Sequence, residues 1–292
     1  MKSSKADIHA RVHSIPRVVF EEESQMTPYA GVVLLQALFK ALNFLPRLRR
    51  CFSHVNRLGI FGPAKLVLLL VLHISLGYRR LRGLDYYRND PMVARVLGLR
   101  RLPDVATVSR MLSEADAKSV EKLRGLSREL VLDRLTAEGF ARVTLDFDGS
   151  VQSTKGHREG TAVGFNRQKK GARSYYPLFC TVAQTSQFLD IHHRPGNVHD
   201  SNGASEFMKA CIDEVQQRLP NTAVETRIDS AFFALELLEV LDSRDVAFTC
   251  SVPFLRLQGL KEEVESRGEW QRIDGTWSFF ETSWRPKTWE GG

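Results

Sequence analysis

The sequence predicts an α/β (α+β) fold in which an all-α N-terminal domain precedes a mixed sheet with flanking helices. From Pro28 to about Glu138 the apolar residues recur with a helical period, and strand patterns are scarce. After Gly139 short runs rich in β-branched and aromatic residues alternate with two helical segments, a pattern typical of strands joined by crossover helices. These observations divide the 292-residue chain into an N-terminal arm (1–28), a helical domain (29–138), a sheet-containing core (139–253) and the start of a β-rich insertion (254–292).

The helical domain is expected to contain five helices whose ends are marked by proline, glycine and aspartate. The first is apolar and is expected to stop at Pro46, because proline inside a helix removes a hydrogen bond. The second has proline near its start and glycine at its end, the polarity that helices favour. The third opens with Asp-Pro and closes with Gly98, and the fourth follows Pro103. The five ranges are 30–45, 62–77, 90–98, 104–116 and about 115–138.

The fourth helix has two interpretations. The motif "VATVSRML" is similar to the start of a recognition helix, and a helix-turn-helix would direct Thr107, Ser109 and Arg110 toward DNA. An ordinary amphipathic helix would instead only bury Val108 and Met111 against its neighbours. We expect the amphipathic helix, and Arg110 remains a candidate DNA-binding residue.

The sheet half predicts strands and helices in the order β-β-β-α-β-α-β. The segment 176–196 reads as two strands joined by the turn "QTSQ", which predicts a hairpin. The later strands alternate with helices over 201–219 and about 230–244, so they are expected to be parallel. An antiparallel half followed by parallel strands with crossover helices is the arrangement of an RNase H-like core.

Two aspartates stand where predicted strands end. Asp148 closes the strand in "RVTLDFDGS" and Asp229 closes the strand in "AVETRIDSAFF". Strand alternation puts Asp146 on the same face as Asp148. Two carboxylates delivered by separate strands suit a site for two divalent ions, which prefer hard oxygen ligands. Taken alone, each aspartate precedes Gly149 or Ser230 and could equally form a turn or cap a helix.

The chain is basic, with a formal net charge of +7 and a pI near 9.3. This balance favours a polyanionic partner only weakly, although the basic residues are clustered. Near the first aspartate, Lys169, Lys170 and Arg173 are candidate contacts to a DNA backbone; a solvated basic loop explains them equally well. The densest basic clusters lie at 47–50, 78–83, 99–101 and 167–174.

Other classes of protein and site are disfavoured. The four cysteines lie far apart without a CxxC pair, so free thiols in a reducing cytoplasm are expected rather than zinc or disulfides. The motif "HHRPGNVHD" has poor spacing for zinc, and His199 or Asp200 is expected only to orient a neighbour near the catalytic edge. The strongest apolar run, 64–78, is shorter than the roughly 20 residues that span a bilayer, so no membrane partner is expected.

Several motifs resemble a known family. "GYRRLRGLDYYRNDPMVARVLG", "LPDVATVSRML", "LDFDGSVQSTKG" and "RIDSAFF" occur in the order found in DDE transposases of bacterial insertion sequences, specifically the group called "IS thirteen-eighty". The resemblance covers most of residues 28–292. It implies an RNase H-like domain that cuts DNA at transposon ends and joins them to a target. It also implies two Mg²⁺ or Mn²⁺ ions held by two aspartates and one glutamate.

Residue by residue, Asp148 matches the first catalytic aspartate of that family and Asp229 the second. The third ligand should be a glutamate on a helix beyond the β-rich insertion, and no residue here matches it; Glu281 and Glu290 stand in a different context. The resemblance therefore implies a C-terminally truncated transposase with little or no strand-transfer activity. Asp146 is expected to be a carboxylate behind the metal ligands or a hydrogen-bonded strand residue.

The resemblance also sets the expected partners and location. These are double-stranded DNA, comprising transposon terminal inverted repeats and target DNA, and a second copy of the chain as a homodimer on paired ends. The expected location is the bacterial cytoplasm, in association with the nucleoid. The main alternative is a non-catalytic DNA-binding remnant that inhibits the intact transposase. A metal-dependent nuclease or resolvase with the same core, and a decayed gene product without function, are further alternatives.

Overall fold

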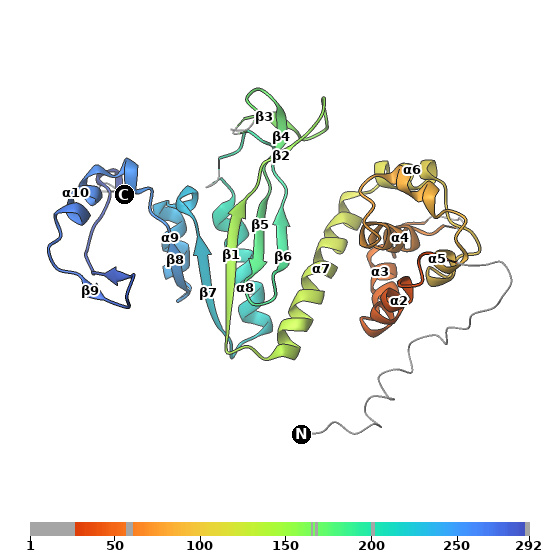
Figure 1. The fold of residues 1–292 in the computed structure, drawn as a ribbon, viewed down its shortest axis with the longest axis horizontal. Helices are drawn as coiled ribbons and strands as arrows, with labels where there is room; N and C mark the ends of the chain where they lie inside the picture. Colours follow the sequence, from red (N-terminus) through yellow and green to blue (C-terminus); the bar gives the residue numbers. More distant parts are fainter. Residues whose placement is uncertain (1–26, 57–60, 165, 167–168, 200–201, 290–292) are drawn as a thin grey trace, which may run out of the picture. The chain divides into compact units, whose positions relative to one another are not determined.

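The computed structural model describes residues 27–56, 61–164, 166, 169–199 and 202–289. The chain divides into two compact units, residues 1–130 and 131–292, which are considered separately (Figure 1). All but the last two residues of the predicted arm lie outside the described residues, as do Asp200 and Glu290.

The first unit is helical, as the periodicity predicts. Its helix starts follow local chemistry: the Asp90 carboxylate accepts hydrogen bonds from the backbone N–H groups of Met92 and Val93, both at 3.0 Å. The Asp104 carboxylate likewise accepts one from Thr107 at 2.7 Å. Leucines such as Leu69 are fully buried in its core. The elements are α2 (Val32–Ala41), α3 (Phe44–Cys51), α4 (Pro63–Ser75), the 3₁₀ helix η1 (Leu81–Tyr86), α5 (Pro91–Val96), α6 (Val105–Ser113) and α7 (Ala117–Glu138), which continues into the second unit.

The predicted helix stop at Pro46 is wrong. The first helix ends at Ala41, and Asn43 adopts a left-handed conformation with φ of 50°. The next helix starts at Phe44 and carries Pro46 in its first turn. Proline is tolerated there because the first N–H groups of a helix have no partner within the helix.

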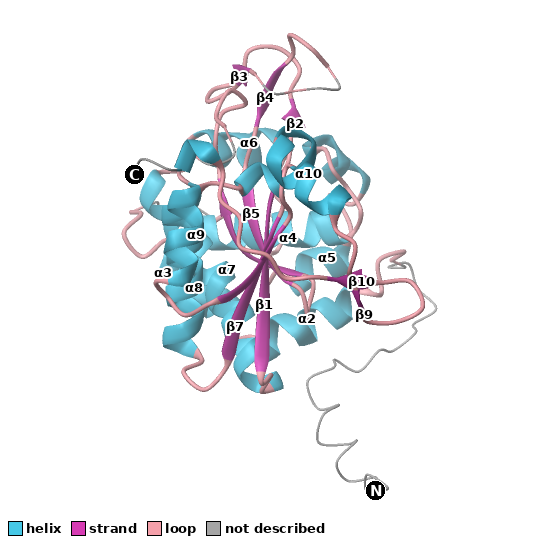
Figure 2. Ribbon diagram, turned by 90° about the vertical axis from the view of Figure 1, so that its left-hand side faces the viewer, coloured by secondary structure: helices cyan, strands magenta, loops and turns pink. Residues whose placement is uncertain are grey.

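The second unit contains a five-stranded sheet in the order β6-β5-β1-β7-β8. Strands β1 and β5 pair antiparallel, as do β5 and β6, whereas β7 and β8 run parallel to β1. This order and these directions confirm the predicted RNase H-like core and the predicted hairpin. Strands β1 and β7 lie side by side in both views (Figures 1 and 2). The elements are β1 (Arg142–Gly149), β5 (Leu178–Val182), β6 (Gln187–His192), α8 (Ala204–Arg218), β7 (Ala223–Ile228), η2 (Ser230–Phe232), α9 (Leu235–Asp242) and β8 (Ala247–Cys250).

The two faces of β1 and β7 differ in character. Alternate residues of β1, Val143, Leu145 and Phe147, are buried in the core together with residues of α7, α8 and α9. The residues between them, from Thr144 to Asp148, line the opposite face with the polar residues of β7. The helices therefore cover the apolar face, and the polar face carries both aspartates of interest.

A small three-stranded sheet lies between β1 and β5 in the chain, where the sequence predicts only a polar segment. It has the order β2-β4-β3 and lies beyond the end of β1 in Figure 1. Two glycines allow its close backbone packing: a Cβ at Gly164 would lie 2.1 Å from the carbonyl oxygen of Gly196. Close backbone contacts between residues far apart in the chain leave no periodic pattern in the sequence. The strands are β2 (Gln152–Ser153), β3 (Ala162–Val163) and β4 (Arg173–Tyr175).

The C-terminal segment begins with a helix and a short hairpin, which agrees with the predicted start of a β-rich insertion. Two tryptophans of this segment, Trp270 and Trp277, are 45% and 67% exposed. The Trp270 ring packs edge-to-face with the Phe280 ring, with the ring centroids 4.6 Å apart, and its Nε1–H donates to the Arg267 carbonyl oxygen. No helix in the described part of the chain has the length and apolar character needed to cross a membrane. The elements are η3 (Phe254–Arg256), α10 (Gln258–Ser266), β9 (Gln271–Arg272), β10 (Ser278–Phe279) and η4 (Lys287–Trp289).

Candidate active site

Asp148 and Asp229 are brought to the same edge of the central sheet. The parallel register of β1 and β7 pairs Phe147 with Ile228, so the two aspartates occupy the next step on neighbouring strands. Neighbouring strands lie about 5 Å apart, a spacing that lets both carboxylates reach one cation or a pair of cations. Both residues are exposed. The structure therefore places them together where the strands end.

The surroundings of the two aspartates differ. Asp148 is still within the sheet and pairs with Phe179 of β5. Asp229 follows β7 and caps the 3₁₀ helix η2 by accepting a hydrogen bond from Ala231 N–H at 2.9 Å. This cap fixes the direction of the Asp229 carboxylate. Asp229 therefore does cap a helix, as one of the two interpretations expects. The cap does not move it away from Asp148, which occupies the matching position on β1.

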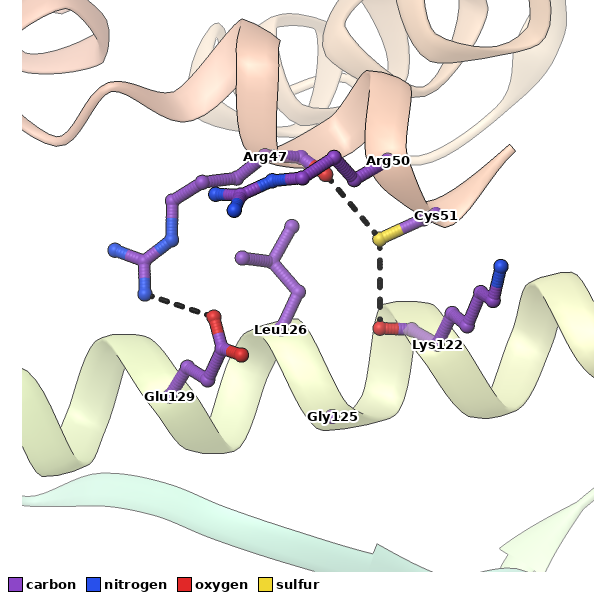
Figure 3. Close-up of a pocket in the computed structure, with 7 residues that line it drawn as sticks. All are labelled: Arg47, Arg50, Cys51, Lys122, Gly125, Leu126 and Glu129. Atoms are coloured by element: carbon purple, nitrogen blue, oxygen red, sulfur yellow. Dashed lines mark hydrogen bonds and ion pairs between the residues drawn. The ribbon is translucent and has the colours of Figure 1, made fainter. Parts of the chain in front are cut away.

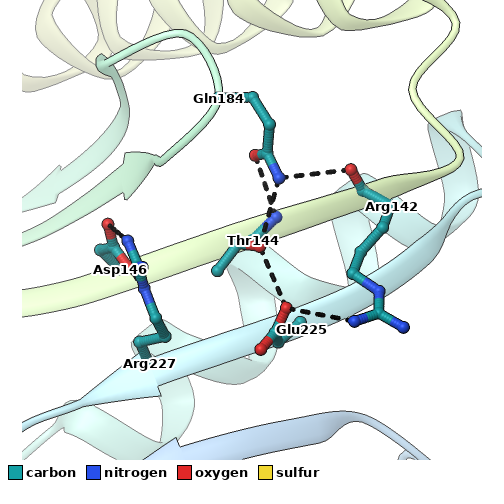
Figure 4. A network of polar contacts seen from close by, with 6 residues as sticks. All are labelled: Arg142, Thr144, Asp146, Gln184, Glu225 and Arg227. Carbon is teal, nitrogen blue, oxygen red and sulfur yellow. Dashed lines mark hydrogen bonds and ion pairs between the residues drawn. The ribbon is translucent and has the colours of Figure 1, made fainter. Parts of the chain in front are cut away.

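Asp146 forms a two-point ion pair with Arg227. The Nε and Nη2 groups of Arg227 donate to the two carboxylate oxygens at 2.6 and 2.7 Å (Figure 4). Asp146 on β1 lies opposite Arg227 on β7. Each residue is two positions before the aspartate of its own strand, on the same face of the sheet. Of the two expectations for Asp146, the hydrogen-bonded strand residue describes its contacts. The carboxylate of Asp146 raises the pKa of Arg227, so the guanidinium stays charged beside the candidate site.

A second polar group lies farther back on the same face. The Thr144 hydroxyl donates to Glu225 at 3.2 Å, and Arg142 lies 3.7 Å from the same carboxylate (Figure 4). The Gln184 side chain closes the group by accepting from the Thr144 N–H and donating to the Arg142 carbonyl. On this face, Asp146 forms an ion pair with Arg227, and Glu225 forms one with Arg142.

The donor set at the sheet edge suits a hard divalent cation. Mg²⁺ is commonly held by one or two carboxylates, with water and substrate phosphates completing its octahedron. Two exposed aspartates on adjacent strands supply those carboxylates. Within the described ranges, no group of three or more histidine, cysteine, aspartate or glutamate side chains is arranged to hold a metal ion.

Cys250 lies beside this edge on β8, opposite Ile228. Burial, and then the negative charge of Asp229, raise the pKa of its thiol. The thiol is therefore protonated at neutral pH and adds no anionic ligand. All four cysteines are free thiols, as predicted, and three of them are buried.

The candidate phosphate contacts lie in β4 and in the loop between β3 and β4 of the small sheet. Lys169 and Lys170 are exposed, and the Lys169 N–H donates to the Asn166 side chain at 3.0 Å. Arg173 in β4 is only half-exposed, and its guanidinium donates to both the hydroxyl and the carbonyl oxygen of Thr161. The two lysines are thus directed to solvent, whereas Arg173 holds β3 and β4 together.

His199 lies in the loop after β6 and is exposed. Its carbonyl oxygen accepts a hydrogen bond at 3.0 Å from Arg194, which is buried and also donates to the carbonyl oxygens of Tyr176 and Asn202. Arg194 therefore fixes this loop beside the small sheet. The sequence motif drew attention to the histidines, but the arginine between them organises the loop.

The first unit carries two further candidates. Arg110 on α6 is exposed while Val108 and Met111 are buried, so α6 is amphipathic and presents Arg110 to solvent. A hollow of about 340 Å³ between α3 and α7 has a basic rim and contains the ion pair of Arg47 with Glu129 at 2.9 Å (Figure 3). It is lined by Arg47, Arg50, Cys51, Lys122, Gly125, Leu126 and Glu129.

Sequence reasoning missed Arg227. It stands two residues before Asp229, as Asp146 stands two residues before Asp148. Opposite charges at matching offsets from the ends of two adjacent parallel strands predict a cross-strand pair. That pattern becomes informative only once the strand register is known, because a shift by one residue would place the charges on opposite faces.

Comparison with known protein families gives one match over nearly the whole chain. A family model described as Transposase DDE domain group 1 matches residues 15–291. No curated protein matches the chain.

Several solved structures are similar at low sequence identity. The Mos1 transposase paired-end complex with left transposon end matches with 11% identity and a TM-score of 0.28, over 72% of this chain and 71% of that one. The piggyBac transposase synaptic complex with hairpin DNA matches with 11% identity and a TM-score of 0.36, over 78% and 52%. The catalytic domain of Mos1 mariner transposase matches with 12% identity and a TM-score of 0.27, over 56% and 78%. This chain thus spans about half the length of the piggyBac chain.

Proposed function

Because this chain belongs to the Transposase DDE domain group 1 family, we propose that it binds the ends of a bacterial insertion sequence and that its sheet edge is a transposase metal site. The observation that carries the proposal is the parallel register of β1 and β7, which sets Asp148 beside Asp229. Membership of the "IS thirteen-eighty" group is part of the same proposal and rests on the motifs around these strands.

In this proposal Asp148 and Asp229 hold the divalent cations, Mg²⁺ or Mn²⁺. Bound cations supply an activated oxygen nucleophile and neutralise charge on the leaving 3′-oxygen. The cap at Ala231 holds the Asp229 carboxylate in position, and the sheet holds Asp148. Arg227 pairs with Asp146, which keeps the Asp146 carboxylate away from the cations.

We also propose that residues 1–292 do not supply the third carboxylate of the catalytic set. The support is that no residue of the sequence matches the third glutamate that the family resemblance implies. Residues 1–292 would then bind metal and DNA and have little or no strand-transfer activity. Losing one ligand weakens cation binding and disturbs the geometry that in-line attack requires.

DNA contact is proposed for both units. Lys169 and Lys170 are exposed between β3 and β4 of the small sheet, where cationic side chains would contact the phosphate backbone and release counterions. Arg110 on α6 is the corresponding candidate in the helical unit. Binding to terminal inverted repeats and target DNA, as a homodimer on paired ends, completes the proposal.

The test is an assay on a plasmid that carries the ends of the element, in Mg²⁺ and in Mn²⁺. We expect residues 1–292 to bind the DNA ends, as measured by a mobility-shift assay. We expect no strand-transfer product. Metal-dependent cleavage that Asp148→Asn abolishes would support the aspartate pair and contradict the missing third ligand. Absence of any DNA binding would contradict the proposed function as a whole.

The alternative function is a DNA-binding inhibitor of the intact transposase, which would follow if residues 1–292 lack the third carboxylate. Both functions require DNA binding, and they separate on one variant. If the chain is an enzyme, Asp148→Ala should abolish whatever metal-dependent DNA cleavage residues 1–292 retain. It should leave both DNA binding and inhibition of the intact transposase unchanged if the chain is an inhibitor.

A further inference from the structure

An aromatic stack in the first unit extends from the core to the surface. The ring of Tyr86 stacks on Tyr78 at 5.8 Å with an interplanar angle of 15°, and Tyr78 stacks on His73 at 5.3 Å and 24°. His73 is buried, whereas Tyr86 is 78% exposed. One face of the Tyr86 ring is therefore covered by Tyr78 and the other is open to solvent.

Several contacts hold the inner rings rigidly. The Nε2–H of His73 donates to the Arg80 carbonyl oxygen at 3.0 Å, and its Nδ1 accepts from the Tyr87 hydroxyl at 2.6 Å. The Tyr78 hydroxyl is hydrogen-bonded to that of Tyr29 at 2.9 Å. His73 and Tyr78 are thus each anchored by hydrogen bonds, and Tyr86 stacks on this anchored pair.

Gly83 makes room for the stack. A Cβ at this position would lie 2.7 Å from the Cδ1 atom of Tyr78, so only glycine lets the ring lie flat on η1. Residues three apart in a 3₁₀ helix lie on the same side, which brings Tyr86 next to the ring that covers Gly83. The sequence thus positions an exposed aromatic ring on a rigid base.

The surroundings of Tyr86 are basic. Four exposed arginines lie between residues 79 and 88, against one aspartate, Asp85, which is 3.8 Å from Arg88. Helix α6, which presents Arg110, packs on η1. The arginines are Arg79, Arg80, Arg82 and Arg88.

We propose that Tyr86 is a stacking site for an unpaired nucleobase of a DNA strand, with the arginines of residues 79–88 contacting the adjoining phosphates. A rigid exposed ring within a cationic surface has the two features that bind single-stranded nucleic acid without sequence preference. The proposal rests on the proposed function for the presence of DNA. It adds that the helical unit binds a strand whose bases are unstacked, as at an opened transposon end.

The experiment measures the affinity of the 292-residue chain for a blunt duplex and for the same duplex with a single-stranded tail. Tyr86→Ala should weaken binding of the tailed DNA by about fivefold to a hundredfold and leave the blunt duplex nearly unchanged, since base stacking contributes on this scale. Tyr86→Trp should restore the preference for the tail. Ile74→Ala, which truncates another exposed apolar side chain of the same unit, is the matched control and should change neither affinity.

Equal loss of both affinities, or no loss, in Tyr86→Ala would overturn the proposal. A change in oligomeric state without a change in binding of the tailed DNA would assign this surface to a protein contact and overturn it as well. If the wild-type chain binds the blunt duplex and has no preference for the tail, only this inference fails. If it binds neither DNA, the proposed function fails with it.

Discussion

At the scale of single residues, the same side-chain chemistry serves structure in one place and the candidate site in another. Asp90, Asp104 and Asp229 all accept hydrogen bonds from the backbone N–H groups that begin a helix. Only Asp229 also stands beside a second carboxylate on a neighbouring strand. The distinction therefore lies in the neighbours and not in the local motif, which explains why a single aspartate in the sequence carries little information.

Asp90→Ala is expected to lower the free energy of unfolding of the first unit by about 1 kcal/mol, because two N–H groups lose their acceptor. Urea unfolding followed by far-ultraviolet circular dichroism measures this change. Asp85→Ala removes an exposed carboxylate from the preceding turn and is the matched control. Equal effects of the two substitutions would contradict the capping role.

Arg227→Met is expected to tighten Mn²⁺ binding. The guanidinium lies one alternation from Asp229, about 7 Å along the strand, and its repulsion of a divalent cation is about 1 kcal/mol in a water-like dielectric, or about fivefold in affinity. Asp146→Asn should act in the opposite direction, because it leaves the positive charge of Arg227 uncompensated. Calorimetric titration with Mn²⁺ measures both changes.

Arg142→Met is the control for the charge change. The substitution removes one positive charge, as Arg227→Met does. Arg142 lies six residues before Asp148 on β1, about 20 Å along the strand, which is beyond the Debye length at physiological salt. Its effect on Mn²⁺ affinity should be negligible. If Arg142→Met tightened binding as much as Arg227→Met, the effect would be one of net charge and not of position.

At the scale of elements, the sequence predicts most helices and the strand order, and it fails where local chemistry is ambiguous. Prolines illustrate the difference: Pro63 and Pro91 begin helices as predicted, whereas Pro46 enters the first turn of a helix instead of ending one. The small sheet was missed because its strands have two or three residues, too few for an alternating pattern. Its packing depends on Gly164 and Gly196, whose close approach is a tertiary feature.

The aromatic cluster of the first unit makes its stability depend on pH. Burial raises the pKa of Tyr87 above its usual value of 10, and the hydrogen bond with Tyr78 raises the pKa of Tyr29 to about 12. A raised pKa favours the protonated form in the folded state, so this stability is fully present below pH 10 and is lost as the pH rises toward the folded values. The free energy of unfolding should therefore fall above pH 10.

Hydrogen exchange of the buried α4 amides across this pH range measures the fall. Tyr87→Phe should reduce the stability at neutral pH, since His73 loses a donor, and should make the fall above pH 10 shallower. Amides of β1 in the second unit are the internal control. An unchanged slope in Tyr87→Phe would contradict the assignment to this residue.

At the scale of the whole molecule, the family match and the candidate site support each other from independent observations. The family model covers residues 15–291, and the register of β1 and β7 places Asp148 beside Asp229. The order of elements in the sequence was enough to predict an RNase H-like core with Asp148 and Asp229 at the ends of two separate strands. It was not enough to predict the Asp146–Arg227 pair or the exposed ring of Tyr86, because both depend on register and packing.

The most direct test of the central claim is the stoichiometry and affinity of Mn²⁺ binding to the 292-residue chain, measured by calorimetry. The account predicts that Asp148→Asn and Asp229→Asn each weaken binding strongly and that the double variant is no weaker than the worse single variant, because the two carboxylates act on shared ions. Asp242→Asn, an exposed aspartate at the end of α9, should have no effect. Mn²⁺ binding that survives both substitutions unchanged would contradict the claim that these two aspartates form a metal site.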